Sequence, residues 1–198
     1  MKELLIVLGV TVVVTGAITL VATWIERPLR VLENALTFIS TSVILFAMVY
    51  ICAEVTMRYG FNSPMPGHLE GAELLLPIIV FFAISYTQAR NGHVGMSLVV
   101  DSLPEHWQRR LNLLTLLLSM LICVVLSYFG TKYSYQLWEY DDVTMTPPYW
   151  RTWPSAAAIA LGYLLVAIRM WLQILYQINP ARFPDSPRDE VEELHVFD

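Results

Sequence analysis

Long stretches without a charged residue recur along this chain, and they constrain its fold more than any other feature. Residues 4–25, 34–53 and 111–131 contain no Asp, Glu, Lys or Arg, and residues 152–178 contain only Arg169. A helix of about 20 apolar residues crosses the hydrocarbon core of a bilayer, which is about 30 Å thick. Because backbone groups in that core find no water, uncharged runs of this length predict membrane-spanning helices.

Composition supports the same class of protein. Of the 198 residues, 56% are hydrophobic and 15% are charged, whereas a soluble domain usually carries about 25% charged residues. The net charge is −5 and the sequence has no basic stripe, which argues against a nucleic-acid partner. We therefore expect an all-α integral membrane protein whose core is four transmembrane helices, at residues 34–57, 69–89, 111–135 and 152–178.

An additional N-terminal transmembrane helix is expected over residues 4–25. A signal peptide is the alternative interpretation, because the apolar run follows Lys2. The run is longer than a usual signal core, however, and it ends in Ala-Thr-Trp-Ile-Glu-Arg, which lacks a small-x-small cleavage pattern. An uncleaved helix is therefore favoured.

The connecting segments define the expected organisation. Residues 1–31 form an N-terminal transmembrane helix with an amphipathic linker, residues 32–178 form the four-helix membrane domain, and residues 179–198 form an acidic cytoplasmic tail. The linker at residues 25–35 mixes apolar and charged side chains. This pattern fits either a short amphipathic helix at the membrane surface or a simple polar linker with moderate helicity. A second short interfacial helix is expected at residues 97–103.

The distribution of Lys and Arg predicts the orientation, because cytoplasmic loops of membrane proteins are enriched in these residues. With the connector between residues 89 and 111 in the cytoplasm, the inner side carries Arg27, Arg30, Arg90, Arg109, Arg110, Arg182 and Arg188, and the outer side carries Lys2, Arg58, Lys132 and Arg151. The bias is modest, and it predicts a cytoplasmic C-terminus and an outer N-terminus.

Ionisable residues in or near the spans are the main candidates for function, because charges inside a membrane are costly. Glu54 and Arg58 are four residues apart near the outer end of one span and can pair on one helix face. Glu70 and Glu73 lie at the start of the next span, at the same membrane level. These four residues form either a polar network that joins helices or docks a partner subunit, or solvated charges at helix ends. Arg169 either extends to the inner headgroups or meets an acidic group of a partner.

The histidines and cysteines provide no sign of a cofactor or catalytic centre. A membrane cytochrome needs His ligands inside its helices, but the four histidines lie at span ends or in loops: His68, His93, His106 and His195. Cys52 and Cys123 sit in apolar runs without metal-ligand spacing. No nucleophile motif is present either. We expect no metal, no cofactor and no enzymatic activity.

Several short motifs follow one another in a recognisable order. They are Glu-Val-Thr-Met-Arg-Tyr-Gly-Phe at 54–61, His-Leu-Glu-Gly-Ala-Glu at 68–73, Ala-Arg-Asn-Gly-His-Val at 89–94 with Asp-Ser-Leu-Pro at 101–104, and Pro-Pro-Tyr-Trp at 147–150 with Pro154. Together they resemble the DctQ-like small membrane subunits of tripartite ATP-independent periplasmic (TRAP) transporters. The resemblance covers about residues 32–176. His68 stands where this family often has Trp, and the span at 4–25 is additional to the family's usual four.

This resemblance implies a non-catalytic subunit of the bacterial inner membrane. Such a subunit packs against a large DctM-like transport subunit, which moves solute with sodium ions, while a periplasmic DctP-like binding protein delivers an organic acid. Carried over to this sequence, Arg90 and His93 shape the cytoplasmic connector. Glu54, Arg58, Glu70 and Glu73 then lie near the surface that faces the binding protein or the large subunit.

Two other functions compete with this hypothesis. A membrane anchor of a respiratory or other redox complex would require haem or quinone ligands. A self-sufficient small transporter or channel would be expected to contain interrupted helices that build an ion or solute site, and the sequence shows no such pair. The leading hypothesis remains an accessory subunit of a sodium-driven importer.

Overall fold

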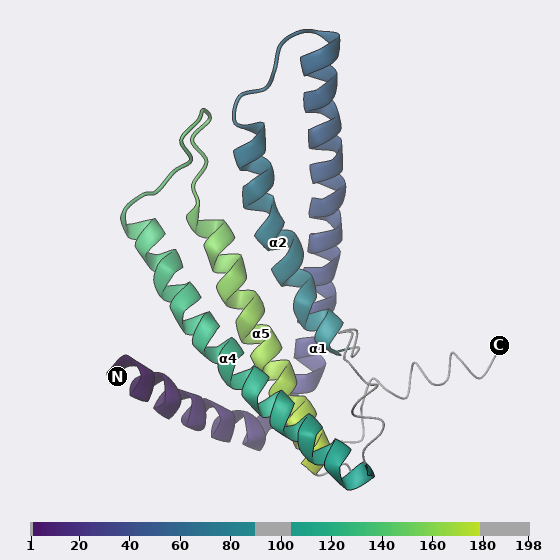
Figure 1. Cartoon of the computed structure of the whole chain (residues 1–198), viewed down its shortest axis with the longest axis vertical. Helices are drawn as coiled ribbons and strands as arrows, with labels where there is room; N and C mark the ends of the chain where they lie inside the picture. The colour runs from purple at the N-terminus through teal and green to yellow at the C-terminus, as the bar shows by residue number, and fades with distance from the viewer. Residues whose placement is uncertain (1, 90–103, 179–198) are drawn as a thin grey trace, which may run out of the picture.

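The computed structural model describes residues 2–89 and 104–178, with side chains described from residue 28 onward except Glu105. The helices of this part are α1 (Lys2–Gly60), α2 (His68–Ala89), α4 (Glu105–Glu139) and α5 (Trp153–Ile178) (Figure 1). The β-structure in these ranges is one isolated antiparallel bridge between Val143 and Arg151. The predicted all-α class is confirmed.

Four helical stretches of the described chain are long and apolar enough to cross a membrane. They are Pro28–Gly60, His68–Ala89, His106–Glu139 and Trp153–Ile178. Each coincides with one of the four predicted core spans, so this part of the prediction is confirmed. The first three stretches extend beyond the predicted spans because these helices continue into the polar segments at their ends.

The additional N-terminal span is not confirmed and stays a prediction. Residues 2–27 are helical, but they are the first part of α1 and continue through Pro28 into the first confirmed span. Two successive membrane crossings need a reversal of chain direction between them, and α1 contains no loop that would provide it. α1 likewise passes without a break through the domain boundary that the sequence predicts at residue 31.

Pro28 lies inside α1 and explains why this helix does not run straight. Proline removes one backbone hydrogen bond and its ring crowds the preceding turn, so a helix bends there. Figure 1 shows a change of direction between the purple N-terminal part of α1 and its blue upright part. Just beyond the proline, Leu29 is 5% exposed and Glu33 is 2% exposed. Residues 25–35 are therefore helical, with two buried side chains after the proline, and both interpretations of this segment stay predictions.

Helix α5 lies at the centre of the arrangement. In the most apolar stretch of α5, 44% of the residues are buried, whereas 6–11% are buried in the corresponding stretches of the other three spans. Figure 1 shows α5 between α4 and α2, with the upright part of α1 on the far side of α2. α5 runs parallel to α2 and antiparallel to α4, while α1 packs mainly on α2.

Small residues allow α5 to approach both of its neighbours closely, as is usual between helices in membranes. A Cβ atom added to Gly162 would lie 2.6 Å from both the Cβ and the carbonyl oxygen of Phe81 on α2. On the other side, a Cβ atom added to Gly130 of α4 would lie 3.3 Å from the Cβ of Ala160. Further along the contact between α4 and α5, Met120, Ala167 and Ile174 form a buried apolar cluster.

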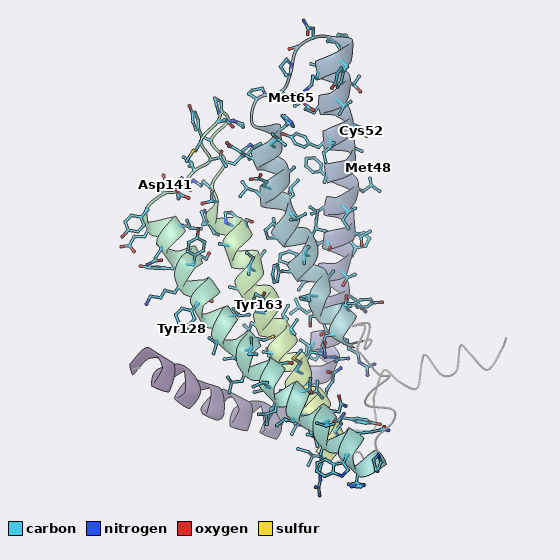
Figure 2. The ribbon with its side chains drawn as sticks, viewed as in Figure 1. Met48, Cys52, Met65, Tyr128, Asp141 and Tyr163 are labelled. Carbon is cyan, nitrogen blue, oxygen red and sulfur yellow. The ribbon has the colours of Figure 1, made fainter. Side chains whose placement is uncertain are left out.

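Large apolar side chains cover the outward faces of α1 and α4. Phe38, Leu45 and Phe46 on α1 are 59–75% exposed, and Met48 and Cys52 also lie on the exposed surface of this helix (Figure 2). In water such a surface would be strongly unfavourable, but in a bilayer it contacts lipid or a partner helix. The exposed apolar surface thus agrees with the membrane assignment.

Candidate functional site

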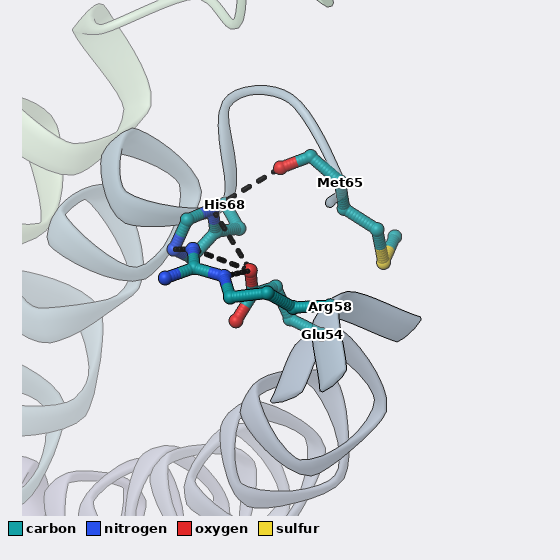
Figure 3. A network of polar contacts seen from close by, with 4 residues as sticks. All are labelled: Glu54, Arg58, Met65 and His68. Atoms are coloured by element: carbon teal, nitrogen blue, oxygen red, sulfur yellow. Dashed lines mark hydrogen bonds and ion pairs between the residues drawn. The ribbon is translucent and has the colours of Figure 1, made fainter. Parts of the chain in front are cut away.

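Glu54, Arg58 and His68 form a polar network where the end of α1 meets the start of α2 (Figure 3). Arg58 donates from Nε to Glu54 Oε1 at 2.8 Å, and its Nη2 lies 2.6 Å from the same oxygen. His68 Nε2 lies 3.1 Å from Arg58 Nη2, and His68 Nδ1 lies 3.7 Å from Glu54 Oε1. The network therefore joins α1 to the first residue of α2.

The loop between the two helices fixes the position of His68. Its Nδ1 lies 3.1 Å from the carbonyl oxygen of Met65, which can only accept a hydrogen bond. Nδ1 is accordingly the donor, and Nε2 accepts from Arg58. Gly67, with φ +73°, makes the turn that leads into α2, a backbone conformation in which a side chain is unfavourable.

The two charged partners differ in their exposure to solvent. The side chain of Glu54 is 4% exposed, whereas that of Arg58 is 44% exposed. A carboxylate that is taken out of water needs a charged or hydrogen-bonding partner, and Arg58 supplies two donors. The spacing of four residues predicts this contact, and His68 is a further member that the sequence analysis did not assign.

Glu70 joins α2 to the loop that precedes α5. Its Oε2 accepts a hydrogen bond from the backbone N–H of Thr146 at 3.2 Å. The same loop contacts the turn before α2, since a Cβ atom added to Gly67 would lie 2.5 Å from the carbonyl oxygen of Pro147. Glu73, one turn further along α2, is exposed and lies outside these contacts. The structure thus separates two carboxylates that the sequence places together.

Residues 142–152 form a short hairpin-like loop between α4 and α5. The backbone N–H of Thr144 donates to the carbonyl of Trp150 at 2.9 Å, and that of Thr152 donates to the carbonyl of Asp142 at 3.2 Å. These bonds hold the two ends of the loop together above α4 and α5. Met145, at 93% exposed, projects from it.

A second set of buried polar residues lies towards the other end of the helices. Ser85 donates to Glu33 Oε1 at 2.7 Å and links α2 to α1. Gln88 donates from Nε2 to Gln173 Oε1 at 2.8 Å, and Gln173 donates back to the carbonyl of Gln88 at 3.0 Å, which links α2 to α5. These contacts satisfy side chains that would otherwise be unpaired in hydrocarbon.

Arg169 occupies the same region and is 4% exposed. It lies one helical turn before Gln173, so it shares the face of α5 that packs on α2. A side chain that extends to the lipid headgroups would be exposed along its length, so this burial contradicts that interpretation.

The remaining predicted residues cannot be placed. Arg90 and His93, the predicted interfacial helix at 97–103 and the acidic tail lie outside the described residues. Within the ranges that the structure describes, no three His, Cys, Asp or Glu side chains come together as a metal site.

Glu33 and Ser40 form contacts between α1 and α2 that were not predicted from the sequence. Ser40 donates to the carbonyl of Ile79 at 2.6 Å, and it is 2% exposed. Glu33, Ser40 and Glu54 are spaced by multiples of seven residues, a period that keeps side chains on one face of a helix facing its partner. This spacing of polar residues in an apolar helix is a signal that could have identified the face of α1 that packs on α2.

Comparison with known proteins identifies the family. Residues 47–179 match the DctQ component of the tripartite ATP-independent periplasmic transporters, which is more than half of the chain. The chain belongs to the DctQ family of TRAP transporter small membrane subunits. The resemblance that the motifs predicted is therefore confirmed. The matched region begins within α1 and includes the whole of α2, α4 and α5.

Two curated relatives carry the same designation. The chain is 28% identical over 106 residues to a TRAP transporter small permease protein, described as putative, of Haemophilus influenzae, a match that covers 54% of this chain and 65% of the relative. It is 24% identical over 131 residues to the ectoine TRAP transporter small permease protein TeaB of Halomonas elongata, which covers 66% of this chain and 61% of the relative. The chain thus spans less than two thirds of each relative.

Proposed function

We propose that this DctQ-family protein is the non-catalytic, non-transporting small subunit of its transporter, holding the large membrane subunit in place. The observation that carries the proposal is that several polar side chains of this protein bond to other parts of the same chain. Glu33 bonds to Ser85, Gln88 to Gln173 and Glu54 to Arg58, so these groups join parts of one chain to one another. A transporter that works alone needs polar groups free to hold solute or ions midway through the membrane.

We propose further that the outer end of the molecule helps to dock a soluble binding protein. The Glu54–Arg58–His68 network and the Glu70–Thr146 hydrogen bond make this end a defined surface. Such a preformed surface loses little freedom on binding. Arg90 and His93 would shape the opposite, cytoplasmic face. Exposed Glu73 is a candidate for contact with the large subunit, and buried Arg169 would support the packing of α5.

The proposed location is the inner membrane with the C-terminus in the cytoplasm. This orientation rests on the distribution of Lys and Arg, and it places the loop with Met145 outside. Met145→Cys tests it, because this position is 93% exposed. A membrane-impermeant maleimide should label the variant in spheroplasts above the background of the unsubstituted chain. Labelling only after the cells are opened would reverse the orientation.

The proposed activity of the whole complex is sodium-driven uptake of an organic acid. Within this division of labour the small subunit does not contact the solute, so its sequence carries no substrate site. The name of one relative refers to ectoine. That name describes the relative, and an organic acid as the solute of this transporter is our proposal.

Reconstitution tests the proposed role. Proteoliposomes with the large subunit, this chain and the binding protein should take up solute under an inward sodium gradient. Vesicles that lack this chain should take up little, and vesicles with this chain alone should take up none. Uptake by the chain alone, or unchanged uptake in its absence, would refute the proposal.

A further inference from the structure

One carboxylate oxygen of Glu54 has two basic side chains beside it. Arg58 Nη2 lies 2.6 Å from Glu54 Oε1, and His68 Nδ1 lies 3.7 Å from the same atom. Arginine is always charged, whereas histidine is charged only when both ring nitrogens carry a proton. Arg58 therefore balances the charge of Glu54 while His68 is neutral, and a proton on His68 would add a second positive charge beside one carboxylate.

The hydrogen bonds of His68 require a neutral ring (Figure 3). His68 Nε2 lies 3.1 Å from Arg58 Nη2, and because arginine has no acceptor, Nε2 must accept this hydrogen bond. Nδ1 donates to the carbonyl oxygen of Met65 at 3.1 Å. A proton on Nε2 would place two donors and two positive charges 3.1 Å apart. The contact between His68 and Arg58 therefore ends when His68 is protonated.

Of these two side chains, Arg58 is the one that can move away. Its side chain is 44% exposed, and that of His68 is 21% exposed. Arg58 lies in the last turn of α1, and its long side chain reaches water easily. His68 is the first residue of α2 and is held by its bond to Met65. It already lies within ion-pair distance of Glu54, so it can replace Arg58 without a large movement.

Further titratable groups of α1 and α2 near this junction make other contacts. Glu70 accepts a hydrogen bond from the loop that precedes α5, and Glu73 is exposed. On α1, the hydroxyl group of Tyr50 lies against Gly71, one turn into α2. These groups are not partners of His68.

The loop before α5, and α5 itself, add no charged contact to His68 among the described residues. The charged side chains of this loop are bonded within it: Asp141 to Arg151 at 3.3 Å, and Asp142 to Thr152 at 3.0 Å. Residues 153–168 of α5 contain no charged side chain. The response of His68 to a proton is therefore determined by Glu54 and Arg58.

We propose that His68 is a pH-sensitive switch that exchanges the partner of Glu54. With a neutral ring, Arg58 pairs with Glu54 and donates to His68. When Nε2 takes up a proton from water, His68 becomes the partner of Glu54 and Arg58 turns to solvent. Imidazole ordinarily changes charge between about pH 5 and pH 8, so mild acidification operates the switch.

The exchange changes the surface without separating the helices. α1 and α2 stay joined through Glu54 and His68, while the end of α1 gains an exposed guanidinium group. The switch does not depend on the proposed role of the subunit.

Double-mutant cycles at pH 8 and at pH 5 test the exchange in the full chain. The first cycle combines Glu54→Gln with Arg58→Ala, and the energy that couples the two residues is measured by SDS unfolding. This coupling should fall by about half or more at pH 5, because an arginine in solvent contributes little. In the His68→Gln background it should be the same at both pH values, because the amide oxygen accepts from Arg58 but does not titrate.

A second cycle measures the replacement partner. The coupling between His68→Gln and Glu54→Gln should rise about twofold or more from pH 8 to pH 5, because the ion pair forms only with a charged ring. His106→Gln is the matched control, since His106 is an exposed histidine of α4. It should leave the pH dependence of both couplings unchanged.

Three results would overturn the switch. Equal coupling of Arg58 to Glu54 at both pH values would mean that Arg58 keeps its place. A loss at pH 5 that persists in His68→Gln would mean that Glu54 itself takes up the proton. A coupling of His68 to Glu54 that does not rise would mean that no exchange of partners takes place.

Nuclear magnetic resonance of the unsubstituted chain tests the switch if a variant fails to fold. With nitrogen-15 in arginine and histidine, the ring signals of His68 report its protonation and the Nε signal of Arg58 reports its contact with Glu54. Both should change over the same pH range, with the Arg58 signal moving towards that of an arginine in an unfolded peptide. An Arg58 signal that stays unchanged while His68 is protonated, or a His68 ring that stays neutral down to pH 5, would contradict the proposal.

Discussion

Arg58→Ala is the substitution that most directly tests the polar network of Glu54, Arg58 and His68. The substitution removes both donors to Glu54 Oε1, which lie at 2.6 and 2.8 Å, and leaves a carboxylate that is 4% exposed. Loss of one partner from a fully buried ion pair costs about 3–5 kcal/mol, and exposed pairs contribute about 0–1 kcal/mol. Because Arg58 itself is 44% exposed, we expect an intermediate loss of about 2 kcal/mol in the free energy of unfolding.

The proposed cause of this loss is the unpaired charge on Glu54. Replacing Glu54 by Gln in the Arg58→Ala background removes that charge, so the double variant should recover about 1 kcal/mol of the loss. Arg151→Ala is the matched control, since it breaks an ion pair whose members are 61% and 70% exposed. Its expected cost is about 0.5 kcal/mol.

The measurement is unfolding by SDS titration in mixed micelles, followed by circular dichroism. The order of stability should be unsubstituted chain, Arg151→Ala, double variant and Arg58→Ala. If Arg58→Ala is no less stable than Arg151→Ala, the ion pair with Glu54 does not stabilise the protein as proposed. If the double variant recovers no stability, the unpaired charge on Glu54 is not the cause of the loss.

Two further substitutions test the helix contacts by the same titration. Gly162→Ala places a methyl group 2.6 Å from the backbone oxygen of Phe81 and should lower the free energy of unfolding by about 2 kcal/mol. Gly60→Ala, which has open space around it, is the control and should change that free energy by less than about 0.5 kcal/mol. Equal effects of the two substitutions would contradict the close packing of α5. Ser85→Ala removes the hydrogen bond to buried Glu33 and should lower the free energy of unfolding by about 1–3 kcal/mol. Ser42 is exposed and bonds within its own helix, so Ser42→Ala should cost less than about 0.5 kcal/mol. A loss for Ser85→Ala as small as that of Ser42→Ala would contradict a stabilising contact between Ser85 and Glu33.

The spans and the contact between Glu54 and Arg58 follow from the sequence because they depend on local patterns. Uncharged runs determine which segments can enter hydrocarbon, and a spacing of four residues places two side chains on one helix face. The family motifs are likewise short and ordered along the chain. These features need no knowledge of how the helices pack.

The rest depends on packing, which hydropathy does not encode. Glu33 follows Arg30 in a charged segment typical of an interface, yet it is 2% exposed because α1 continues through this segment against α2. Arg169 is buried because its face of α5 packs on α2, a direction that its uniformly apolar neighbours do not indicate. His68 joins the network of Glu54 and Arg58 only because the loop between α1 and α2 places its side chain next to that of Arg58.

We propose that this chain works as the small subunit of a larger membrane complex. Co-purification in a mild detergent, after expression with the neighbouring genes of the transporter, tests this role. The tagged chain should come out with a large, many-helix membrane protein in constant stoichiometry. A tagged chain that purifies alone, folded and without that subunit, would rule the role out.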